Sequence, residues 1–393
     1  MVLSKANSLL VYVGNPTQYH SPIWRAIAHS EIEVEVLFGD EIGAKPFYSA
    51  ECASIIEWDV PVLEGYAHRF FKNWSASSRK GFWSRTNPSI FSYVFRNNSA
   101  YVLIHGYDTA SSWLVYFAAL LSRKKIIWRG ETIEPRGGGR KWIKTVKSIV
   151  LPIYFLGCHK MLYSCILNKL YLEKFLPVNS PKLVSFPCAV DNSFFCTNRL
   201  NETADKERLR QELGLPENHV VIASCSRLTK RKRIELIIES ISRMTSKEVS
   251  LLLIGDGVEN QSLTRLAKSL GVQLKVTGIV GQYKVAQLLS IVDVFVLMSS
   301  YDASPKALNE AANYAIPLIA SEGIGTSRDL VHHGVNGYVI CAGEESRLTG
   351  YFDLLVSDPK KRKKMGEKTK DIIENYSIDS DLDGLREAMK NDG

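Results

Sequence analysis

The chain has 393 residues, of which 45% are hydrophobic and 23% are charged. This length exceeds what one hydrophobic core ordinarily supports, so we expect two globular domains, and the composition excludes fibrous and low-complexity proteins. The formal net charge is +8, and residues 69–174 hold 18 basic against 4 acidic residues. The first half is therefore expected to meet something anionic, for which nucleic acid and an anionic membrane face are the candidates.

The ends and the cysteines of the chain indicate a compartment. Residues 9–13 suit a first strand better than a secretory signal, and the apolar stretch 149–158 is too short to span a bilayer. The seven cysteines include no Cys-x-x-Cys pair. We therefore expect a cytoplasmic protein with reduced, buried thiols.

Strand-like and helix-like patterns alternate along the chain. In the first half, strands are expected at 9–13, 31–38, 60–63, 101–104, 125–128, 161–165 and 183–186, and helices at 23–29, 111–123, 142–155 and 168–175. In the second half, strands are expected at 220–225, 250–254, 274–277, 292–298 and 318–320, and helices at 234–244, 261–270, 283–290 and 304–314. This alternation predicts an α/β protein with two doubly wound domains facing across a cleft. The polar stretch 198–205 suggests a boundary that gives domains 1–199 and 200–393.

The stretch that follows the expected strand at 292–298 carries two carboxylates. Ser304 and Pro305 predict a helix start, which places Asp302 in the loop above the strand and Glu310 about two turns into the helix. Two carboxylates around a helix start at the carboxyl end of a strand suit a phosphorylated, hydroxyl-rich ligand. The alternative interpretation is a solvated Asp and a surface Glu that compensate the helix dipole.

Residues 70–95 are aromatic and basic without a sustained period, and they include Lys72, Arg79, Lys80 and Arg85. They predict either a core helix followed by a solvent-exposed loop, or a surface that contacts lipid headgroups or an extended acceptor molecule. The expected helix at 142–155 has an apolar body with cationic edges and suits a membrane surface as well as a core. No nucleic-acid-binding motif is present, so we expect the anionic partner to be a membrane.

From residue 220 onward the ends of the expected strands resemble, in order, those of the retaining GT-B glycosyltransferases of the group 1 family (glycosyltransferase family four). The matching segments are Ser226-Arg227-Leu228-Thr229-Lys230-Arg231-Lys232, Ile254-Gly255-Asp256-Gly257, Thr277-Gly278-Ile279-Val280, Asp302-x7-Glu310, the segment 317–337, and the lead-in 187–195. Each segment alone is weakly specific for the family, whereas six segments in the right order are a strong indication of it. The resemblance covers residues 185–375, and the first half only by its layout.

The resemblance implies roles for individual residues. Arg227 and Lys232 would neutralise the diphosphate of a nucleotide-sugar, Glu310 would bind the ribose hydroxyls, and Asp302 stands where the family has a Glu near the donor sugar. Asp is one methylene shorter than that Glu. The full donor-binding set is Arg227, Lys232, Gly278, Ile279, Ser304, Pro305, Lys306, Ala307, Glu310 and Gly14.

In the first half, the family's sugar-contacting His has no clear counterpart. His105 and Glu131, each near the end of an expected strand, are the two candidates. The implied catalytic set is therefore Asp302, Glu310, Arg227, Lys232 and His105. The family layout also allows the last helix to pack back on the first domain.

These inferences predict an enzyme that transfers a sugar, with retention, from a UDP- or GDP-sugar to a carbohydrate or lipid-linked saccharide. The resemblance implies no metal and no other cofactor, and a place in bacterial-type surface polysaccharide or glycan synthesis, peripheral on the cytoplasmic membrane face. The alternative is a sugar-nucleotide enzyme of the same fold, either an inverting transferase or a non-hydrolysing epimerase. A dinucleotide oxidoreductase is disfavoured because the Gly255-Asp256-Gly257 turn lacks the third glycine.

Overall fold

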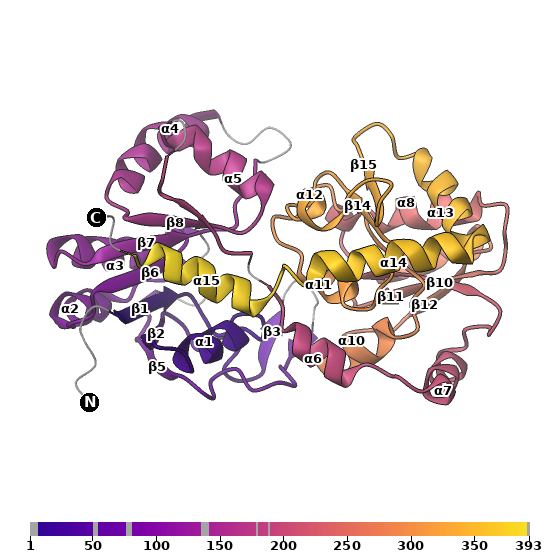
Figure 1. Cartoon of the computed structure of the whole chain (residues 1–393), viewed down its shortest axis with the longest axis horizontal. Coiled ribbons are helices and arrows are strands. Elements are labelled where there is room, and N and C mark those ends of the chain that lie inside the picture. Colours follow the sequence, from indigo (N-terminus) through magenta and orange to yellow (C-terminus); the bar gives the residue numbers. More distant parts are fainter. Residues whose placement is uncertain are drawn as a thin grey trace. The chain divides into compact units, whose positions relative to one another are not determined.

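A computed structural model of the chain describes residues 7–49, 54–75, 81–134, 141–177, 180–187 and 189–390 (Figure 1). The chain folds into two compact units. Unit 1 comprises Met1–Phe47, Val60–Cys188 and Ile378–Gly393, and unit 2 comprises Tyr48–Asp59 and Ala189–Ser377. The last segment of the chain thus belongs to unit 1, although it follows unit 2 in the sequence.

Unit 1 is built on a seven-stranded parallel sheet in the order β5-β2-β1-β6-β7-β8-β9. Its strands are β1 (Ser8–Val13), β2 (Glu33–Phe38), β5 (Ala67–Phe70), β6 (Tyr101–His105), β7 (Lys125–Arg129), β8 (Lys160–Tyr163) and β9 (Leu183–Ser185). Its helices are α1 (Ser21–Ala28), η2 (Phe82–Ser84), α2 (Pro88–Arg96), α3 (Ala110–Leu121), α4 (Lys141–Leu156), α5 (Ile166–Leu172), η3 (Glu173–Phe175) and α15 (Ile378–Ala388).

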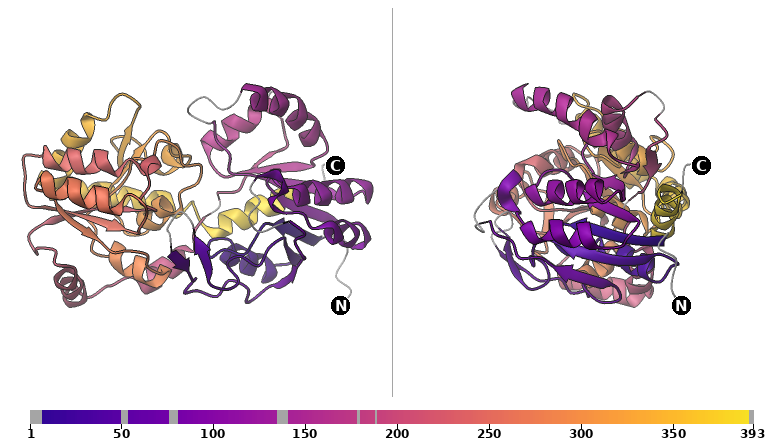
Figure 2. Two further views of the ribbon diagram at one scale, coloured as in Figure 1. Left: turned by 180° about the vertical axis from the view of Figure 1, so that it is seen from behind. Right: turned by 90° about the vertical axis from the view of Figure 1, so that its left-hand side faces the viewer.

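Helices cover both faces of this sheet because successive strand residues point to opposite faces. Leu9 packs in a cluster with residues of α1 and α15, whereas Leu10 packs in a second cluster with residues of α2, α3 and α4. The approach of α15 to the sheet requires Gly384, since a Cβ there would lie 2.0 Å from the Ser185 carbonyl oxygen. Figure 2 shows the two units from behind and from the side.

Unit 2 is built on a six-stranded parallel sheet in the order β12-β11-β10-β13-β14-β15. Its strands are β10 (Val220–Cys225), β11 (Val249–Ile254), β12 (Gln273–Val276), β13 (Val294–Leu297), β14 (Leu318–Ser321) and β15 (Gly337–Ile340). Its helices are α6 (Asn192–Asn198), α7 (Thr203–Leu213), η4 (Lys230–Lys232), α8 (Ile234–Ser242), α9 (Asn260–Ser269), α10 (Gln282–Leu289), α11 (Lys306–Ala312), α12 (Ser327–Leu330), α13 (Arg347–Ser357) and α14 (Pro359–Ile373). A separate two-stranded sheet joins β3 (Phe47–Ser49) and β4 (Ser54–Ile56).

The predicted fold class of two doubly wound α/β domains is confirmed, but several strand assignments differ. Residues 60–63 form no strand. Pro61 has no N–H for a ladder, and the carbonyls of Pro61 and Val62 instead accept hydrogen bonds from Arg25 and Ser21 side chains at 2.9 and 2.7 Å. Strands β3, β4, β5 and β15 were not predicted. Strand β15 begins at Gly337, where a Cβ would lie 1.8 Å from the Leu318 carbonyl oxygen.

The cysteines and the basic segment differ in part from the expectations. Cys196 and Cys341 are exposed, so the expectation that the thiols are buried is wrong for these two, while Cys158 and Cys165 are buried. In the aromatic and basic segment, Arg79 and Lys80 lie outside the described residues. Among the helices of the described residues, none is long and apolar enough to cross a membrane.

Candidate functional site

The strand order of unit 2 reverses between β10 and β13, because β11 and β12 follow on one side of β10 and β13 to β15 on the other. In an open parallel sheet such a reversal leaves a crevice at the carboxyl ends of the two strands, and ligands bind there. The loop that follows β10 begins at Ser226 and contains Arg227. The loop that follows β13 leads to Asp302, so the topology of this unit brings the two predicted loops to one place.

An ion pair between Lys232 and Asp302 joins these two loops. The Lys232 side chain is only 9% exposed and that of Asp302 16%, so the pair is largely removed from water. The backbone supports the same contact, since the amide of Ser300 donates to the Arg231 carbonyl at 2.9 Å. Two residues that the sequence assigned separately to the diphosphate and to the donor sugar therefore bind each other in this structure.

Glu310 is buried on α11, with 3% of its surface exposed. The pKa of the Cys225 thiol, at the end of β10, is raised by burial and further by the Glu310 carboxylate, and is lowered by Lys232. Burial, followed by the Glu310 charge, also raises the pKa of the Tyr314 hydroxyl. Glu310 and Lys232 thus both act electrostatically on the end of β10, at the reversal of the sheet.

Three glycines allow the loops around this site to pack closely. A Cβ at Gly255 would lie 2.3 Å from the Ser226 carbonyl oxygen, and a Cβ at Gly257 would lie 2.4 Å from that of Leu228. A Cβ at Gly323 would lie 2.4 Å from the Ser300 carbonyl oxygen. Distances this short exclude any side chain, so these glycines serve the packing of the loops.

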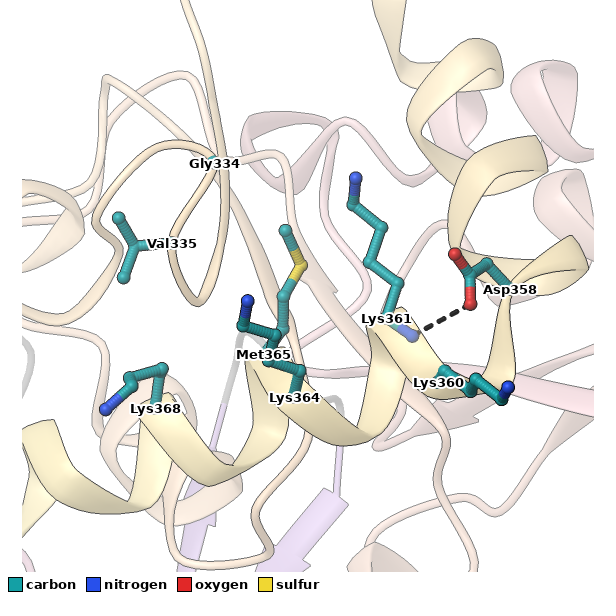
Figure 3. A pocket seen from close by; sticks show the side chains of 8 residues that line it. All are labelled: Gly334, Val335, Asp358, Lys360, Lys361, Lys364, Met365 and Lys368. Carbon is teal, nitrogen blue, oxygen red and sulfur yellow. Dashed lines mark hydrogen bonds between the residues drawn. The ribbon is translucent and has the colours of Figure 1, made fainter.

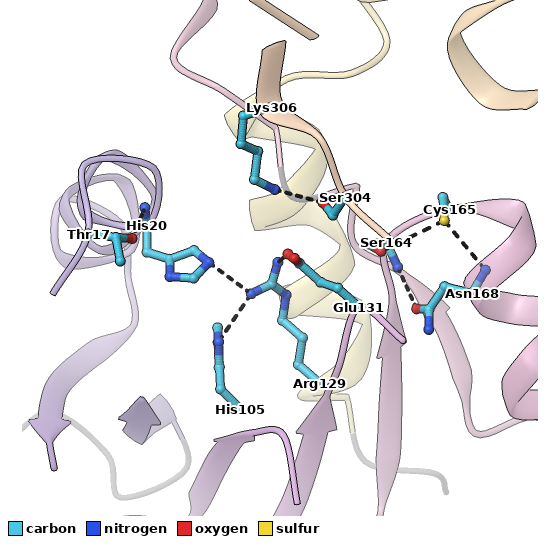
Figure 4. Close-up of polar contacts among 10 residues, drawn as sticks. All are labelled: Thr17, His20, His105, Arg129, Glu131, Ser164, Cys165, Asn168, Ser304 and Lys306. Atoms are coloured by element: carbon cyan, nitrogen blue, oxygen red, sulfur yellow. Dashed lines mark hydrogen bonds and ion pairs between the residues drawn. The ribbon is translucent and has the colours of Figure 1, made fainter. Parts of the chain in front are cut away.

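Helix α11 starts later than predicted. It begins at Lys306 with Pro305 at the N-cap position, and no side chain caps it. The Ser304 hydroxyl, predicted to cap this helix, instead accepts a hydrogen bond from Lys306 Nζ at 3.0 Å (Figure 4). Ala307 is half-buried in the first turn.

The other predicted donor-binding residues of unit 2 lie at neighbouring strand ends. Arg227 is exposed in the loop after β10. Gly278 follows β12 with φ of 74°, a conformation that favours glycine, and forms a β-bridge with Gly255. Ile279 is 40% exposed beside it.

Several buried hydroxyls at this reversal have no hydrogen-bond partner among the described residues. They belong to Ser224 and Ser226, at the end of β10, and to Ser299, after β13. Buried polar groups are normally paired, so unpaired hydroxyls at one place are typical of a site that receives water or a polar ligand.

In unit 1 the strand order reverses between β1 and β6, and His105 is the last residue of β6. Its ring lies beside Arg129, the last residue of β7: Arg129 Nη1 is 3.2 Å from His105 Nδ1 and 3.4 Å from His20 Nε2. Arg129 Nη2 pairs with Glu131 at 2.7 Å (Figure 4). The two candidates His105 and Glu131 therefore contact the same guanidinium.

Arg129 is a functional candidate that the sequence analysis missed. Its side chain is 2% exposed, and its Cζ lies 5.0 Å from the Phe186 ring centre. A guanidinium only donates hydrogen bonds, so a hydrogen bond from Arg129 to either imidazole requires an unprotonated ring nitrogen as the acceptor. Two imidazoles, a guanidinium and a carboxylate at one strand end offer both donors and acceptors to a hydroxyl-rich ligand. The signal in the sequence was an Arg at the end of an otherwise apolar strand.

Gly14 follows β1, and the side chain of Arg85 lies over it. A Cβ at Gly14 would lie 2.7 Å from Arg85 Cζ, and Arg85 Nη2 donates to Asn15 Oδ1 at 2.9 Å. Arg85 was expected on a basic outer surface, and this expectation is wrong because its guanidinium is bound within the first loop.

A cavity in unit 2 lies apart from these residues. It has a volume of about 560 Å³ and is lined by Gly334, Val335, Asp358, Lys360, Lys361, Lys364, Met365 and Lys368 (Figure 3). It contains none of the predicted site residues. Among the described residues, no three His, Cys, Asp or Glu side chains form a cluster that could hold a metal ion, and this includes the Asp-x-Asp sequences at 379–383.

The topology of both units is that of GT-B proteins. HepE of Anabaena, solved with UDP and glucose, superposes with a TM-score of 0.73 over 97% of this chain and 99% of that chain, at 14% identity. WaaG, a glycosyltransferase involved in lipopolysaccharide biosynthesis, superposes with a TM-score of 0.62 over 98% of this chain, at 12% identity. At such low identity these similarities concern the fold alone.

Residues 205–372 match the family described as glycosyl transferases group 1. The resemblance to group 1 glycosyltransferases that the strand ends predicted is thereby confirmed over this segment. Among curated relatives, the N-acetyl-alpha-D-glucosaminyl L-malate synthase of Bacillus anthracis is 26% identical over 180 residues, which cover 46% of this chain and 47% of that relative. The lipopolysaccharide core biosynthesis glycosyltransferase LpsE of Rhizobium meliloti is 28% identical over 159 residues, 40% of this chain and 46% of that relative. The chain thus matches about half the length of these curated relatives.

Proposed function

We propose that the protein is a retaining glycosyltransferase that moves a sugar from a nucleoside diphosphate donor to a saccharide acceptor. The observation that carries this proposal is the position of Lys232, Asp302 and Glu310 at the strand-order reversal of unit 2, in a segment that matches the group 1 family. The unpaired hydroxyls at the same place are consistent with a polar ligand.

In the proposed reaction, an acceptor hydroxyl oxygen forms a bond to the anomeric carbon of the sugar as the bond from that carbon to the diphosphate breaks. The hydroxyl proton passes to the leaving phosphate oxygen, on the same face of the sugar, so that the configuration is retained. Arg227 and Lys232 stabilise the charge that develops on the diphosphate, which is the role that a metal ion has in other transferases. Glu310 accepts hydrogen bonds from the two ribose hydroxyls.

The Lys232–Asp302 ion pair has a consequence for this mechanism. A diphosphate that reaches Lys232 competes with Asp302 for the same ammonium. Donor binding therefore requires either that the Lys232–Asp302 ion pair opens, or that the three N–H groups of the ammonium are divided between Asp302 and the diphosphate. In this proposal Asp302 holds Lys232 in place before the donor arrives and is released toward the donor sugar when the diphosphate takes its place on Lys232.

The donor is proposed to be a UDP- or GDP-sugar, without a metal or another cofactor. Structures of HepE contain UDP and UDP-glucose, which makes UDP the first nucleotide to test. The acceptor is proposed to be a saccharide or a lipid-linked saccharide used in bacterial-type surface polysaccharide synthesis, as the names of several relatives suggest. A lipid-linked acceptor implies a protein peripheral to the cytoplasmic membrane face.

The test is a thermal-shift screen with UDP, GDP and ADP, since a ligand that binds only the native state raises the melting temperature. The nucleotide that stabilises the protein then selects the sugar donors for turnover assays with and without acceptor saccharides. Acceptor-dependent release of that nucleoside diphosphate is the expected result. Conversion of the donor without any acceptor would favour the alternative, a sugar-nucleotide enzyme of the same fold, and stabilisation by none of the three would refute the proposal.

A further inference from the structure

Helix α4 of unit 1 is apolar on two opposite faces. Its inner face packs in the core through Leu151, Tyr154 and Phe155, which are at most 2% exposed. Its outer face carries five large apolar side chains that are between 47% and 72% exposed: Trp142, Val146, Ile149, Ile153 and Leu156. Large apolar side chains that line one face of a helix are normally buried, and the described residues of unit 1 leave this outer face largely uncovered.

The five outer residues form one straight stripe. Their spacing alternates between four and three residues from Trp142 to Leu156, which places them on one side of a helix. At 1.5 Å per residue the stripe is about 21 Å long. In Figure 1, α4 lies at the periphery of unit 1. The exposed fractions of the five side chains leave the stripe open to a large partner.

The charge of the segment that contains α4 selects the kind of partner. In the sequence, residues 135–172 contain seven Lys or Arg and no Asp or Glu. Of these, Lys160 is buried, and Lys147 on α4 has its Nζ 5.5 Å from the Tyr107 ring centre. A second copy of this chain would bring two such cationic segments together, whereas a surface of anionic lipid headgroups has the complementary charge.

We propose that the α4 stripe is the surface through which this protein lies on a bilayer that contains anionic lipid. The helix lies in the plane of the interface, with Trp142, Val146, Ile149, Ile153 and Leu156 among the upper acyl chains, and the net positive charge of the segment attracts the anionic headgroups. This inference rests on the membrane association in the proposed function and assigns it to one helix. It also moves the contact away from the basic segment 70–95, in which Arg85 is bound internally.

The position of α4 in the chain gives this contact a use. The helix follows the carboxyl end of β7, where Arg129 lies, and leads to the start of β8. It therefore runs from the carboxyl edge of the sheet back to the amino edge, and its Trp142 end lies on the side of the Arg129, His105 and Glu131 cluster. An acceptor held in the same membrane by its lipid has a short path to that edge.

The experiment is flotation of the full chain with vesicles of phosphatidylcholine alone or with added phosphatidylglycerol. Wild type is expected to float with the anionic vesicles and much less with the neutral ones. The double variant Ile149→Gln, Ile153→Gln is expected to partition at least about tenfold less onto the anionic vesicles, because two of the apolar side chains that enter the bilayer become polar. Both side chains are exposed, so the melting temperature should stay within about 2 °C of wild type, as surface substitutions usually allow.

A matched control separates this contact from general attraction of a basic protein. The variant Lys360→Glu, Lys364→Glu reverses two exposed lysines on α14 of unit 2 (Figure 3) and is expected to float like wild type. In addition, the tryptophan fluorescence of wild type should shift to shorter wavelength on anionic vesicles, and Trp142→Phe should lose most of this shift. Should the Ile149→Gln, Ile153→Gln variant melt much earlier than wild type, Leu156→Gln at the end of the stripe replaces it.

Two results would overturn the proposal. One is flotation of the stripe variant equal to that of wild type. The other is a concentration-dependent dimer in the absence of vesicles that the stripe variant abolishes, which would assign the stripe to a second copy of the chain. Failure of the proposed enzymatic function is distinguished separately: stripe-dependent flotation without any glycosyl transfer leaves the membrane contact standing, and transfer to a water-soluble acceptor without flotation leaves the enzyme standing.

Discussion

Replacing Asp302 by Asn removes the negative partner of Lys232 while it preserves the size of the side chain. Lys232 keeps its ammonium in a place where only 9% of the side chain is exposed. Breaking a fully buried ion pair by removing one partner costs about 3 to 5 kcal/mol. Asp302 is 16% exposed and the Asn oxygen still accepts a hydrogen bond, so we expect a smaller loss of about 2 kcal/mol.

The assay is thermal unfolding of wild type, Asp302→Asn, Lys232→Met and the double variant. In a unit of about 200 residues, about 1 kcal/mol corresponds to roughly 2 to 4 °C, so Asp302→Asn should lower the melting temperature by about 4 to 8 °C. The double variant leaves no unpaired charge and should recover part of this loss. The resulting coupling between the two positions is expected to be about 1 to 2 kcal/mol.

The same variants separate the two roles proposed for Lys232. Without Asp302 the ammonium has no internal counter-ion, so Asp302→Asn should bind free UDP or GDP at least as tightly as wild type, whereas Lys232→Met should bind it at least about tenfold more weakly. Additive effects on the melting temperature would show that the two side chains are not coupled. Equal weakening of nucleotide binding in both single variants would refute the idea that Asp302 competes with the diphosphate.

Further predictions concern the other site residues, the metal and one ion pair of unit 1. Glu310→Gln should lower turnover at least about 100-fold and weaken nucleotide binding, because one charged acceptor for the ribose is lost, and unchanged nucleotide affinity would contradict this role. Arg227→Ala and Lys232→Ala should each reduce the rate about 10- to 1,000-fold with the fold intact, and near-normal rates in both would place the diphosphate elsewhere. Activity should survive EDTA, and loss of activity that Mn²⁺ restores would refute the metal-free mechanism. Hydrogen bonds from Arg386 lower the pKa of Glu31 to about 2 from 4.5, so the stability that this carboxylate contributes is present above pH 4.5 and is lost toward pH 2. The difference in melting temperature between wild type and Glu31→Gln should therefore shrink as the pH falls through that range, and a constant difference would contradict the ion pair between α15 and the start of β2.

The sequence by itself determined the elements of the fold and the ends of the strands in the second half. Largely apolar runs of three to seven residues, each followed by Gly or Ser, identified β10, β11, β13 and β14, because a strand buried on both faces of a parallel sheet is mostly apolar. The glycines at 255, 257 and 323 were singled out by the family resemblance, and the structure supplies the reason, since each stands where two backbones touch. Strand β15 was missed because its first residue is a glycine that contributes no hydrophobic signal.

Only the tertiary structure decided which side chains meet. Lys232 and Asp302 are 70 residues apart, and their ion pair depends on the order of the strands, which places β13 beside β10. The sequence pattern is periodic within one element and contains no record of that order. Likewise, Arg129 lies beside His105 only because β7 pairs with β6, with His105 opposite Arg129 in the register. The exposure of the α4 stripe is also a tertiary property. An apolar residue gives the same sequence signal whether its side chain is buried or exposed, and only the packing of neighbouring elements decides which it is.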